Sequence, residues 1–480
     1  MDPKKLILVT GATGYIGGHL IPHLLERGYR VRCLVRDTTR LQSRVWFSQV
    51  EIIQCDIINC KTLGKAMEGV STAYYLIHSM AQGRRYHKLD LSAAGNFASA
   101  AITASVEHII YLGGLADPNT KIGLHMRSRI QTGDVLRQGR VPVTEFRAGV
   151  IIGPGSISFE MIRYLAEQFP LLVGPRWLHN RSQPIATQNV LDYLLAALET
   201  PDCMGKIFEI GGPNILTYAE AMLEYARLRG LKRRLLTLPI APIRLMAYWV
   251  DKLTPIPVRI AAPLIEGMRS DSVVRDDAAQ RVFPHIQPSD YEAAVSSALS
   301  QLSPTQIEPV WNSSSSPVII IKHAGFLIDF RKICVEATPA AVYQAFTGLG
   351  GKHGWLYQDG LWKLRGLLDW LMGGPGMRGR QDETELRLGQ VVDFYRVEAL
   401  EPGQMLRLRA DLKAPGDGWM EWQVRPQPTG DAQLSQGAFF APKGLPGFLY
   451  WYILFPVHRL VFAGLINRIA RLAIEIQQSK

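Results

Sequence analysis

Residues 5–17 read KLILVTGATGYIG, a short apolar run followed at once by a loop with three glycines. An apolar run that ends in glycines is typical of a buried parallel strand. Such glycines permit a tight turn, let backbone amides approach a pyrophosphate, and place the N-terminus of the next helix against its negative charge. We therefore predict a dinucleotide-binding loop before a helix at 17–27, formed by Gly11, Ala12, Thr13, Gly14, Tyr15, Ile16 and Gly17.

Strand and helix patterns alternate beyond this loop. Strands are expected at 29–35, 50–55, 72–77, 106–112 and 142–147, and helices at 60–68, 86–104 and 122–137. This alternation specifies an α/β Rossmann fold with a doubly wound parallel sheet. A helix is expected at 218–229. The proline-broken apolar stretch at 236–268 either covers a pocket or forms short packed helices.

The composition limits the classes of function. At about 150 residues per domain, the 480 residues predict two or three domains. The 53 Lys and Arg residues against 42 Asp and Glu residues give a net charge of +11. Because this charge is spread in proportion to length, with no basic arm or tail, we predict no nucleic-acid partner.

The cysteines and histidines show no metal-binding pattern. No two of the five cysteines have CxxC spacing, and no HExxH motif occurs, so we predict no metal site and no disulfide framework. The apolar run at the N-terminus is too short for a signal peptide. These features indicate a reducing compartment, and we predict a cytoplasmic protein.

The end of the second predicted strand selects between NAD and NADP. Residues 34–37 read LVRD. An acid here usually binds the ribose 2′-hydroxyl of NAD, whereas an arginine suits the 2′-phosphate of NADP. Arg36 can bind that phosphate with its planar guanidinium, while Asp37 is a candidate ribose ligand. We favour NADP(H) over NAD(H).

The sequence pattern of the C-terminal third differs from that of the first 300 residues. Prolines and serines at 303–317 predict a linker, placed at 303–325 between domains 1–302 and 326–480. Strand candidates that alternate in hydrophobicity, as in an antiparallel sheet, lie at 327–336, 390–399, 404–412, 419–425 and 432–440.

A long helix is expected at 449–477. Its uncharged stretch, 444–458, contains two prolines and is shorter than the ~20 residues of a spanning helix. Arg459, Arg468 and Arg471 recur at near-helical spacing. The helix therefore either lies on a membrane surface or closes the sheet with its arginines in water.

The first 300 or so residues resemble the extended, atypical short-chain dehydrogenase/reductases, in their NmrA-like branch. The motifs that carry this resemblance are TGATGYIG at 10–17, LVRD at 34–37, CDI at 55–57, YYLIHSM at 74–80, YLGGL at 111–115 and FRAGVIIGPGS at 146–156. The resemblance implies that Asp56 and Ile57 flank the adenine, and that Leu76, Ile77 and His78 line the cofactor. Asp56 has a second interpretation as a strand cap.

The catalytic residues of that superfamily are not preserved. Its redox-active members use a serine and a tyrosine whose pKa is lowered by a lysine four residues later. Here residues 112–115 read LGGL, and HMRSR at 125–129 keeps the spacing without the residues. His125 becomes the candidate proton donor, and Arg129 a candidate ligand of the nicotinamide ribose, although arginine does not titrate. Otherwise His125 is a polar residue beside the cofactor; Tyr111 and His78 are reserve donors.

Residues 326–480 hold six of the ten tryptophans. The motifs GWLYQDGLWKLRG, GRQDETELRLGQVVDFYRVE, QGAFFAPKGLPGFLYWY and PVHRLVF resemble a domain of unknown function found behind this dehydrogenase branch. The layout resembles the START/polyketide-cyclase (SRPBCC-like) helix-grip fold, an α+β domain with an antiparallel sheet and a long C-terminal helix. That resemblance implies an apolar ligand between sheet and helix; otherwise the aromatic residues form core and turns.

Two functions are compatible with this pattern. The first is an NADPH-dependent oxidoreductase with a degenerate Ser-Tyr-Lys site that acts on an apolar small molecule. The second is a non-catalytic NADP-binding redox sensor, or an assembly or regulatory protein of the NmrA type.

Overall fold

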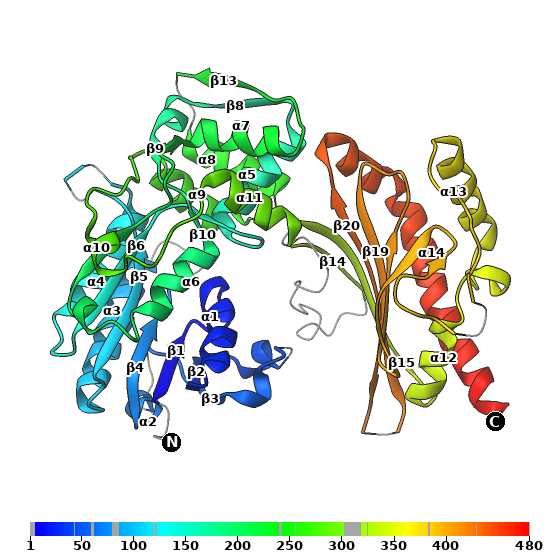
Figure 1. Ribbon diagram of the computed structural model, residues 1–480, viewed down its shortest axis with the longest axis horizontal. Coiled ribbons are helices and arrows are strands. Elements are labelled where there is room, and N and C mark those ends of the chain that lie inside the picture. The colour runs from blue at the N-terminus through cyan, green and yellow to red at the C-terminus, as the bar shows by residue number, and fades with distance from the viewer. Residues whose placement is uncertain are drawn as a thin grey trace. The chain divides into compact units, whose positions relative to one another are not determined.

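The chain divides into two compact units, Met1–Ser313 and Ser314–Lys480, coloured from blue to green and from yellow-green to red in Figure 1. The computed structural model describes residues 5–42, 44–58, 62–78, 86–117, 119–120, 122–239, 242–254, 256–301, 318–323, 325–382, 385–428 and 430–479. Most of the predicted linker at 303–325 lies outside these residues.

A seven-stranded parallel sheet forms the centre of the first unit. Its described strands lie in the order β11 (Ile207–Ile210), β6 (Val143–Ala148), β5 (His108–Gly114), β4 (Val70–Tyr75), β1 (Leu6–Thr10), β2 (Arg30–Val35) and β3 (Glu51–Gln54). The chain order reverses at β1, which lies between β2 and β4. Ligands of doubly wound sheets bind at such a reversal, outside the carboxyl ends of the strands. The predicted Rossmann-like sheet is confirmed, and β11 is an addition.

Both faces of this sheet are covered. The helices that alternate with the strands are α1 (Tyr15–Glu26), α2 (Leu63–Met67), α3 (Tyr86–Thr103), α4 (Leu124–Arg137) and α6 (Thr187–Ala196). Helices α3 and α4 pack together on one face, and α1 and α6 on the other (Figure 1). Accordingly, Ile7 and Val9 of β1 join one apolar cluster while Leu6 and Leu8 join another. Burial on both faces explains why this strand reads as a continuous apolar run.

The other elements that follow β6 lie outside the seven-stranded sheet. They are β7 (Ile151–Ile152), α5 (Ile157–Gln168), β8 (Leu171–Pro175), β9 (Arg181–Ser182), β10 (Ile185–Ala186), β12 (Leu216–Thr217), α7 (Tyr218–Leu228), β13 (Arg234–Leu238), α8 (Ile243–Leu253), α9 (Val258–Gly267), α10 (Ala278–Val282) and α11 (Tyr291–Ser300). The proline-broken stretch is therefore a strand and two short helices. Helices α8 and α9 begin directly after Pro242 and Pro257, and α9 packs against α4.

The second unit is built on an antiparallel sheet. Its described strands lie in the order β14 (Val318–His323), β15 (Phe326–Val335), β20 (Ala432–Pro442), β19 (Gly416–Pro426), β18 (Met405–Ala410), β17 (Tyr395–Glu401) and β16 (Val391–Val392). The predicted antiparallel sheet is confirmed. The strand expected at 390–399 is divided in two, because Asp393 turns the chain with a left-handed φ of 53°.

Three helices accompany this sheet: α12 (Pro339–Thr347), α13 (Asp359–Leu371) and α14 (Gly444–Gln478). Helix α14 runs along the sheet in contact with β15 and β20 (Figure 1). The helix continues through Pro456 and Arg459, so the expectation that its apolar part is too short is wrong. By length and composition alone α14 could cross a membrane. Only 28% of its most apolar 18-residue segment is buried inside the protein.

Among the described cysteines, Cys33, Cys203 and Cys334 are free thiols. Cys55 is disulfide-bonded, which departs from the expectation of a chain without such bonds. No group of three or more potential metal-ligating side chains occurs in the described part of the chain.

Candidate functional site

The glycine loop leaves β1 at the reversal point of the first sheet. Gly11 has a left-handed φ of 73°, and a Cβ atom on it would lie 2.5 Å from the carbonyl oxygen of Leu76. A Cβ atom on Gly17 would collide with the carbonyl oxygen of Gly11. Only glycine suits both positions. The loop therefore passes close to the end of β4 and the start of α1, as the predicted dinucleotide site requires.

Hydrogen bonds hold this loop in place. The Thr10 hydroxyl donates to the carbonyl oxygen of Tyr74 at 2.8 Å and accepts from the amide of Leu76 at 3.2 Å. Gly14 caps α1, whose first turn contains no acidic residue. The free amides and the positive end of the helix dipole there favour a bound anion such as a phosphate.

A cavity of about 250 Å³ extends from this loop across the carboxyl ends of β1, β4, β5 and β6. The predicted site residues among those that line it are Gly11, Gly14, Tyr15, Ile16, Gly17, Leu76, His78, His125 and Arg129. Ala12, Thr13 and Ile77 lie in the same segments but outside the lining. Leu76 and His78 line it without Ile77 because side chains alternate sides along an extended segment.

Arg36 follows β2 at the same edge of the sheet as the glycine loop, since Leu34 pairs with Thr10 in the parallel register. Its side chain is exposed. The neighbouring carboxylate of Asp37 accepts hydrogen bonds from the amide and hydroxyl of Thr39, the latter at 2.6 Å. Asp37 thus caps the turn after β2, which reduces its availability as a ribose ligand.

A second arginine near this turn, Arg44, was not among the predicted residues. Its guanidinium lies 3.1 Å from where a Cβ atom on Gly18 would be, beside the first turns of α1. Burial, followed by the charge of Arg40, lowers the pKa of Arg44 to about 10. The spacing of Arg36, Arg40 and Arg44, one arginine every fourth residue, was the signal in the sequence for a basic side to this site.

Asp56 and Ile57 lie on the loop after β3 and do not line the cavity. An oxygen of the Asp56 carboxylate accepts from the amide of Ile58 at 3.2 Å. Asn96 of α3 donates to the carbonyl oxygen of Ile57 at 2.9 Å. These contacts correspond to the strand-cap interpretation of Asp56, and the role of both residues toward an adenine stays a prediction.

His125 and Arg129 lie in α4 and line the same cavity as the glycine loop. His125 is 7% exposed. Burial, followed by the charges of Arg129 and His78, lowers the pKa of His125 to about 3. The imidazole is therefore neutral at physiological pH, so it can donate a hydrogen bond but is not an imidazolium acid.

The other candidate groups, on Arg129 and Tyr111, form hydrogen bonds with backbone carbonyl oxygens. A terminal nitrogen of Arg129 donates to the carbonyl oxygen of Leu112 at 2.6 Å. The hydroxyl of Tyr111 donates to the backbone carbonyl of Arg129 at 2.8 Å, and Tyr111 is not among the cavity residues. Tyr111 therefore fixes α4 to β5 and does not face the cavity as a donor.

Gly113 and Gly114 stand where the superfamily's serine is expected. A Cβ atom on Gly114 would lie 2.8 Å from the sulfur of Met126 and 3.1 Å from Cδ of Arg129. Glycine lets the side chains of α4 approach the end of β5. The hydroxyl of the serine is replaced by the thioether and guanidinium of these two residues.

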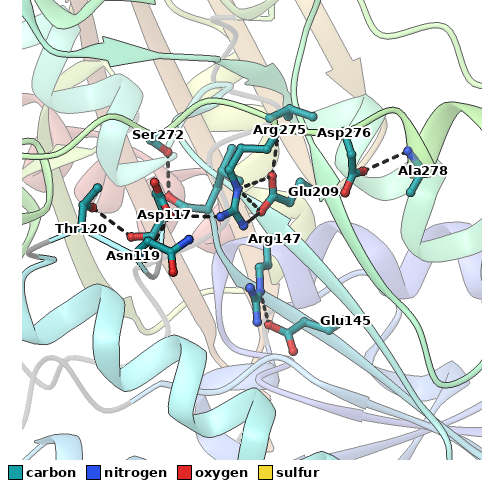
Figure 2. A network of polar contacts seen from close by, with 12 residues as sticks. Asp117, Asn119, Thr120, Glu145, Arg147, Glu209, Ser272, Arg275, Asp276 and Ala278 are labelled. Carbon is teal, nitrogen blue, oxygen red and sulfur yellow. Dashed lines mark hydrogen bonds and ion pairs between the residues drawn. The ribbon is translucent and has the colours of Figure 1, made fainter.

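Charged and polar contacts fix the ends of the strands that carry the site (Figure 2). Arg275 donates to Asp117 at 3.2 Å and from Nε to Glu209 of β11 at 3.0 Å. Ser272, which lines the cavity, donates from its hydroxyl to the carbonyl oxygen of Leu115 at 2.8 Å. The loop that carries Ser272 and Arg275 is thereby bound to the segments after β5 and to β11.

Glu145 of β6 is fully buried and pairs with two arginines. Nε of Arg147 donates to its carboxylate at 2.7 Å, and Arg137 of α4 donates to the other oxygen. Sequence patterns did not reveal this cluster, because an acid in an apolar strand gives no indication of its distant partner. The pair Arg137–Glu145 sets the position of α4 and so of His125.

The remaining wall of the cavity is mostly aliphatic, and its hydroxyl side chains are Ser156, Ser158, Tyr218 and Ser272. Its aliphatic residues from α5 and α9 and the loop after α9 are Ile157, Met161, Ile162, Leu264 and Met268. No Asp, Glu or Lys occurs among the described lining residues. A neutral apolar molecule, or one that develops negative charge, suits this lining better than a cation.

Residues 3–152 match the NmrA-like family, and residues 323–465 match the family described as a protein of unknown function (DUF2867). The first unit carries an NmrA-like domain. The second carries a DUF2867 domain. The N-terminal resemblance is thereby confirmed at the level of an NAD(P)-binding domain of the short-chain dehydrogenase/reductase type.

Several curated proteins are similar to a part of this chain. The photosystem II assembly factor Ycf39 of Trieres chinensis is 25% identical over 248 residues, 50% of this chain and 74% of the relative. A (4-alkanoyl-5-oxo-2,5-dihydrofuran-3-yl)methyl phosphate reductase of Streptomyces griseus is 25% identical over 293 residues, 59% and 92% of the two chains. A ceramide reductase of Caulobacter vibrioides is 24% identical over 243 residues, 50% and 75% of the two chains.

Solved structures share the fold of the NmrA-like domain. The triphenylmethane reductase of Citrobacter sp., in a complex with NADP(H), superposes with a TM-score of 0.50 at 20% identity. The match covers 61% of this chain and 99% of that one. At this identity the similarity establishes the Rossmann-like fold.

Proposed function

We propose that the NmrA-like domain is an NADPH-dependent oxidoreductase that reduces an apolar small molecule. The observation that carries this proposal is the single cavity that joins the glycine loop to His125 and Arg129 and to an apolar wall. A nicotinamide dinucleotide lying from the α1 N-terminus toward β5 would bring its reactive end between the two polar side chains and that wall. Reductases among the relatives agree with this reading.

The residues present fit a dinucleotide. A Cβ atom on Gly11 or Gly17 would collide with backbone carbonyl oxygens, so the loop keeps a course that only glycine permits. The first turn of α1 contains no acidic residue that would repel a phosphate. Arg36 would bind the 2′-phosphate, with Arg44 beside α1 adding positive charge. Leu76 and His78 would line the ribose and nicotinamide. The cofactor supplies a hydride when it is bound.

The chain would stabilise the charge that develops on the acceptor. Neutral His125 donates an N–H hydrogen bond to an oxygen of the substrate, as a polarising group. The permanently charged guanidinium of Arg129 lies close enough to lower the pKa of His125, so it also favours an oxyanion there. Because neither group is a strong acid, the preferred substrates are quinones and enones, whose reduced forms delocalise the charge and take a proton from water.

The missing serine, tyrosine and lysine favour a second candidate function. A chain that binds NADPH without reducing anything would serve as a redox sensor or as an assembly or regulatory protein. The similarity to an assembly factor agrees with that alternative.

Purified full-length protein with NADPH and a panel of quinones, enones and ketones separates the two functions. The reductase proposal expects turnover that falls at least about tenfold in His125→Ala, with a kcat/KM that is flat between pH 5 and 8 because His125 does not titrate there. Tight NADPH binding without turnover of any acceptor supports the alternative.

We propose that the second unit is a ligand-binding module. The antiparallel sheet with α14 along it supports the START/polyketide-cyclase (SRPBCC-like) helix-grip fold, and a cavity between them would hold an apolar ligand. We place the protein in the cytoplasm, with peripheral membrane contact through α14.

A further inference from the structure

The second unit contains a cavity of about 310 Å³ between the sheet, α13 and α14. Its walls are strongly aromatic, with side chains from all three elements: Trp362, Phe394, Trp419, Phe439, Trp451 and Phe462. Cavities of this size and lining bind apolar molecules with a few polar contacts. The polar groups of the lining therefore decide which apolar molecules fit.

Two of these polar groups lie together. Nδ1 of His458 is buried and has no hydrogen-bond partner among the described residues. Burial, followed by the charge of Arg365, lowers the pKa of His458 to about 4, so the imidazole is neutral. Arg365 reaches from α13 toward α14, where it donates to the hydroxyl of Tyr450 at 3.2 Å. A buried nitrogen without a partner is costly unless a ligand supplies one.

The cavity reaches the surface between the two helices. Leu364 and Leu368 of α13 and Val457 of α14 all line it, yet they are 50%, 47% and 43% exposed. These residues form the rim. A ligand that enters here passes between α13 and α14.

The surface around this rim is apolar on both helices. On α13, Leu364, Leu367, Leu368 and Leu371 recur at i, i+3, i+4 and i+7, a stripe that faces outward, and Trp370 beside it is 63% exposed. On α14, the large apolar residues that are exposed are Leu449, Tyr452, Ile453, Val457 and Leu460. A patch of this kind on a folded protein marks a contact with another apolar surface.

The charges on α13 and α14 indicate which kind of surface this apolar patch contacts. Residues 359–372 and 443–479, which include both helices, contain six basic and three acidic side chains. Of the acids, Asp369 is fully buried, Asp359 pairs with Lys363 at 2.7 Å and Glu475 pairs with Arg468 at 3.1 Å, so the two helices keep an excess of positive charge. Apolar stripes flanked by basic residues bind the interface of anionic lipids. Helix α14 does not need to span the bilayer, because its other face packs on the sheet through Phe448, Trp451 and Phe462.

We propose that the α13–α14 surface docks on an anionic membrane, and that the cavity behind it takes an amphiphile from that membrane, binding its polar oxygen with Arg365 and His458. Suitable ligands have one apolar chain or ring system and one carboxylate or carbonyl group. The proposal rests on the ligand-binding role of the second unit and is independent of hydride transfer in the first.

Leu371 and Leu388 form a matched pair for the docking test, since both are 66% exposed and only Leu371 belongs to the stripe. Full-length protein is floated with vesicles of phosphatidylcholine and phosphatidylglycerol at low salt. We expect wild type and Leu388→Asp to float and Leu371→Asp to lose at least about tenfold in bound fraction. Wild type that stays soluble, or Leu371→Asp that floats equally well, overturns the docking. A salt-independent dimer lost in Leu371→Asp, without vesicle binding, would show a protein interface instead.

The ligand test uses dibromostearic acid, whose bromines quench the tryptophans of the cavity. We expect saturable quenching in wild type and an affinity about tenfold weaker in Arg365→Met and His458→Phe. His458→Phe keeps the ring that stacks on Phe462 at 5.2 Å, and should keep vesicle binding. Equal affinity in both variants, or no quenching in wild type, overturns the site. Titration of the same variants with NADPH reports separately on the function proposed for the first unit.

Discussion

Arg129 donates a hydrogen bond of 2.6 Å to the carbonyl oxygen of Leu112. The side chain that replaces the superfamily's lysine is thereby fixed to the end of β5. Its charge acts on His125 one turn earlier, whose pKa it lowers in addition to the effect of burial.

Replacement of Arg129 by methionine should therefore change His125. With the cation removed, we expect the pKa of His125 to rise, as measured by NMR titration of the imidazole, and NADPH affinity to fall about tenfold. The control is Arg127→Met, because Arg127 is exposed on the same helix and does not line the cavity. An unchanged pKa of His125 in Arg129→Met would contradict the coupling.

The glycine loop should not tolerate a methyl group. In Gly17→Ala the new Cβ atom meets the carbonyl oxygen of Gly11, so we expect NADPH affinity to fall at least about 100-fold as the loop moves from the phosphates. In Gly64→Ala, nothing lies within 4 Å of the new atom. Fluorescence titration with NADPH should show this control unchanged.

Arg36 should determine the choice of cofactor. We expect Arg36→Ala to weaken NADPH binding about 10- to 100-fold while NADH binding stays the same, because only NADPH carries the 2′-phosphate. Arg30→Ala serves as the control, since Arg30 begins β2 at the opposite edge of the sheet. Isothermal titration calorimetry with NADPH and with NADH measures the ratio of the two affinities. A wild-type preference for NADH would refute the assignment.

Glu145 should contribute strongly to stability. Glu145→Ala leaves Arg137 and Arg147 without their shared buried anion, and such losses cost about 3 to 5 kcal/mol. Glu51 also binds two arginines, Arg30 and Arg32, but is 41% exposed; we expect at most about 1 kcal/mol for Glu51→Ala. Urea unfolding measures both. Equal losses in the two variants would contradict the distinction.

Stability should depend on pH through His125. The imidazole has a pKa of about 6.5 in the unfolded chain and about 3 in the folded protein, so the unfolded state binds the extra proton between these values. Stability from this residue is complete above pH 6.5 and falls as the pH decreases, by up to about 1.4 kcal/mol per unit.

His125→Leu removes this titration. The melting temperature of the variant should therefore fall less steeply than that of wild type between pH 6.5 and 4. Parallel curves for the two proteins would show that His125 carries a proton in the folded state.

Local signals in the sequence were sufficient for most of the fold. The structure of β1 and of the loop after it could be predicted from adjacent residues. A strand that is buried on both faces needs consecutive apolar residues, and the left-handed backbone at position 11 needs glycine. Strand β11 was not predicted because Ile207–Ile210 is short. One of its four residues is also charged: Glu209, whose partner Arg275 lies 66 residues away in the sequence.

The candidate site could be predicted in part. The spacing of a motif whose residues had changed pointed to His125 and Arg129, which line the cavity; their roles stay predictions. The orientation of the α13 stripe could not, because leucines at helical spacing usually face a core. Only the fold shows that Leu371 faces outward while Trp362 faces the cavity.

Glu145 also constrains residues that carry no charge. Its carboxylate occupies the space that a side chain on Gly133 would need, and a Cβ atom on Gly113 would lie 3.1 Å from one of its oxygens. The residues at 113, 133, 137 and 147 therefore depend on the acid at 145. In relatives these positions should covary, and a chimera that exchanges α4 alone will fold poorly unless β5 and β6 come from the same parent.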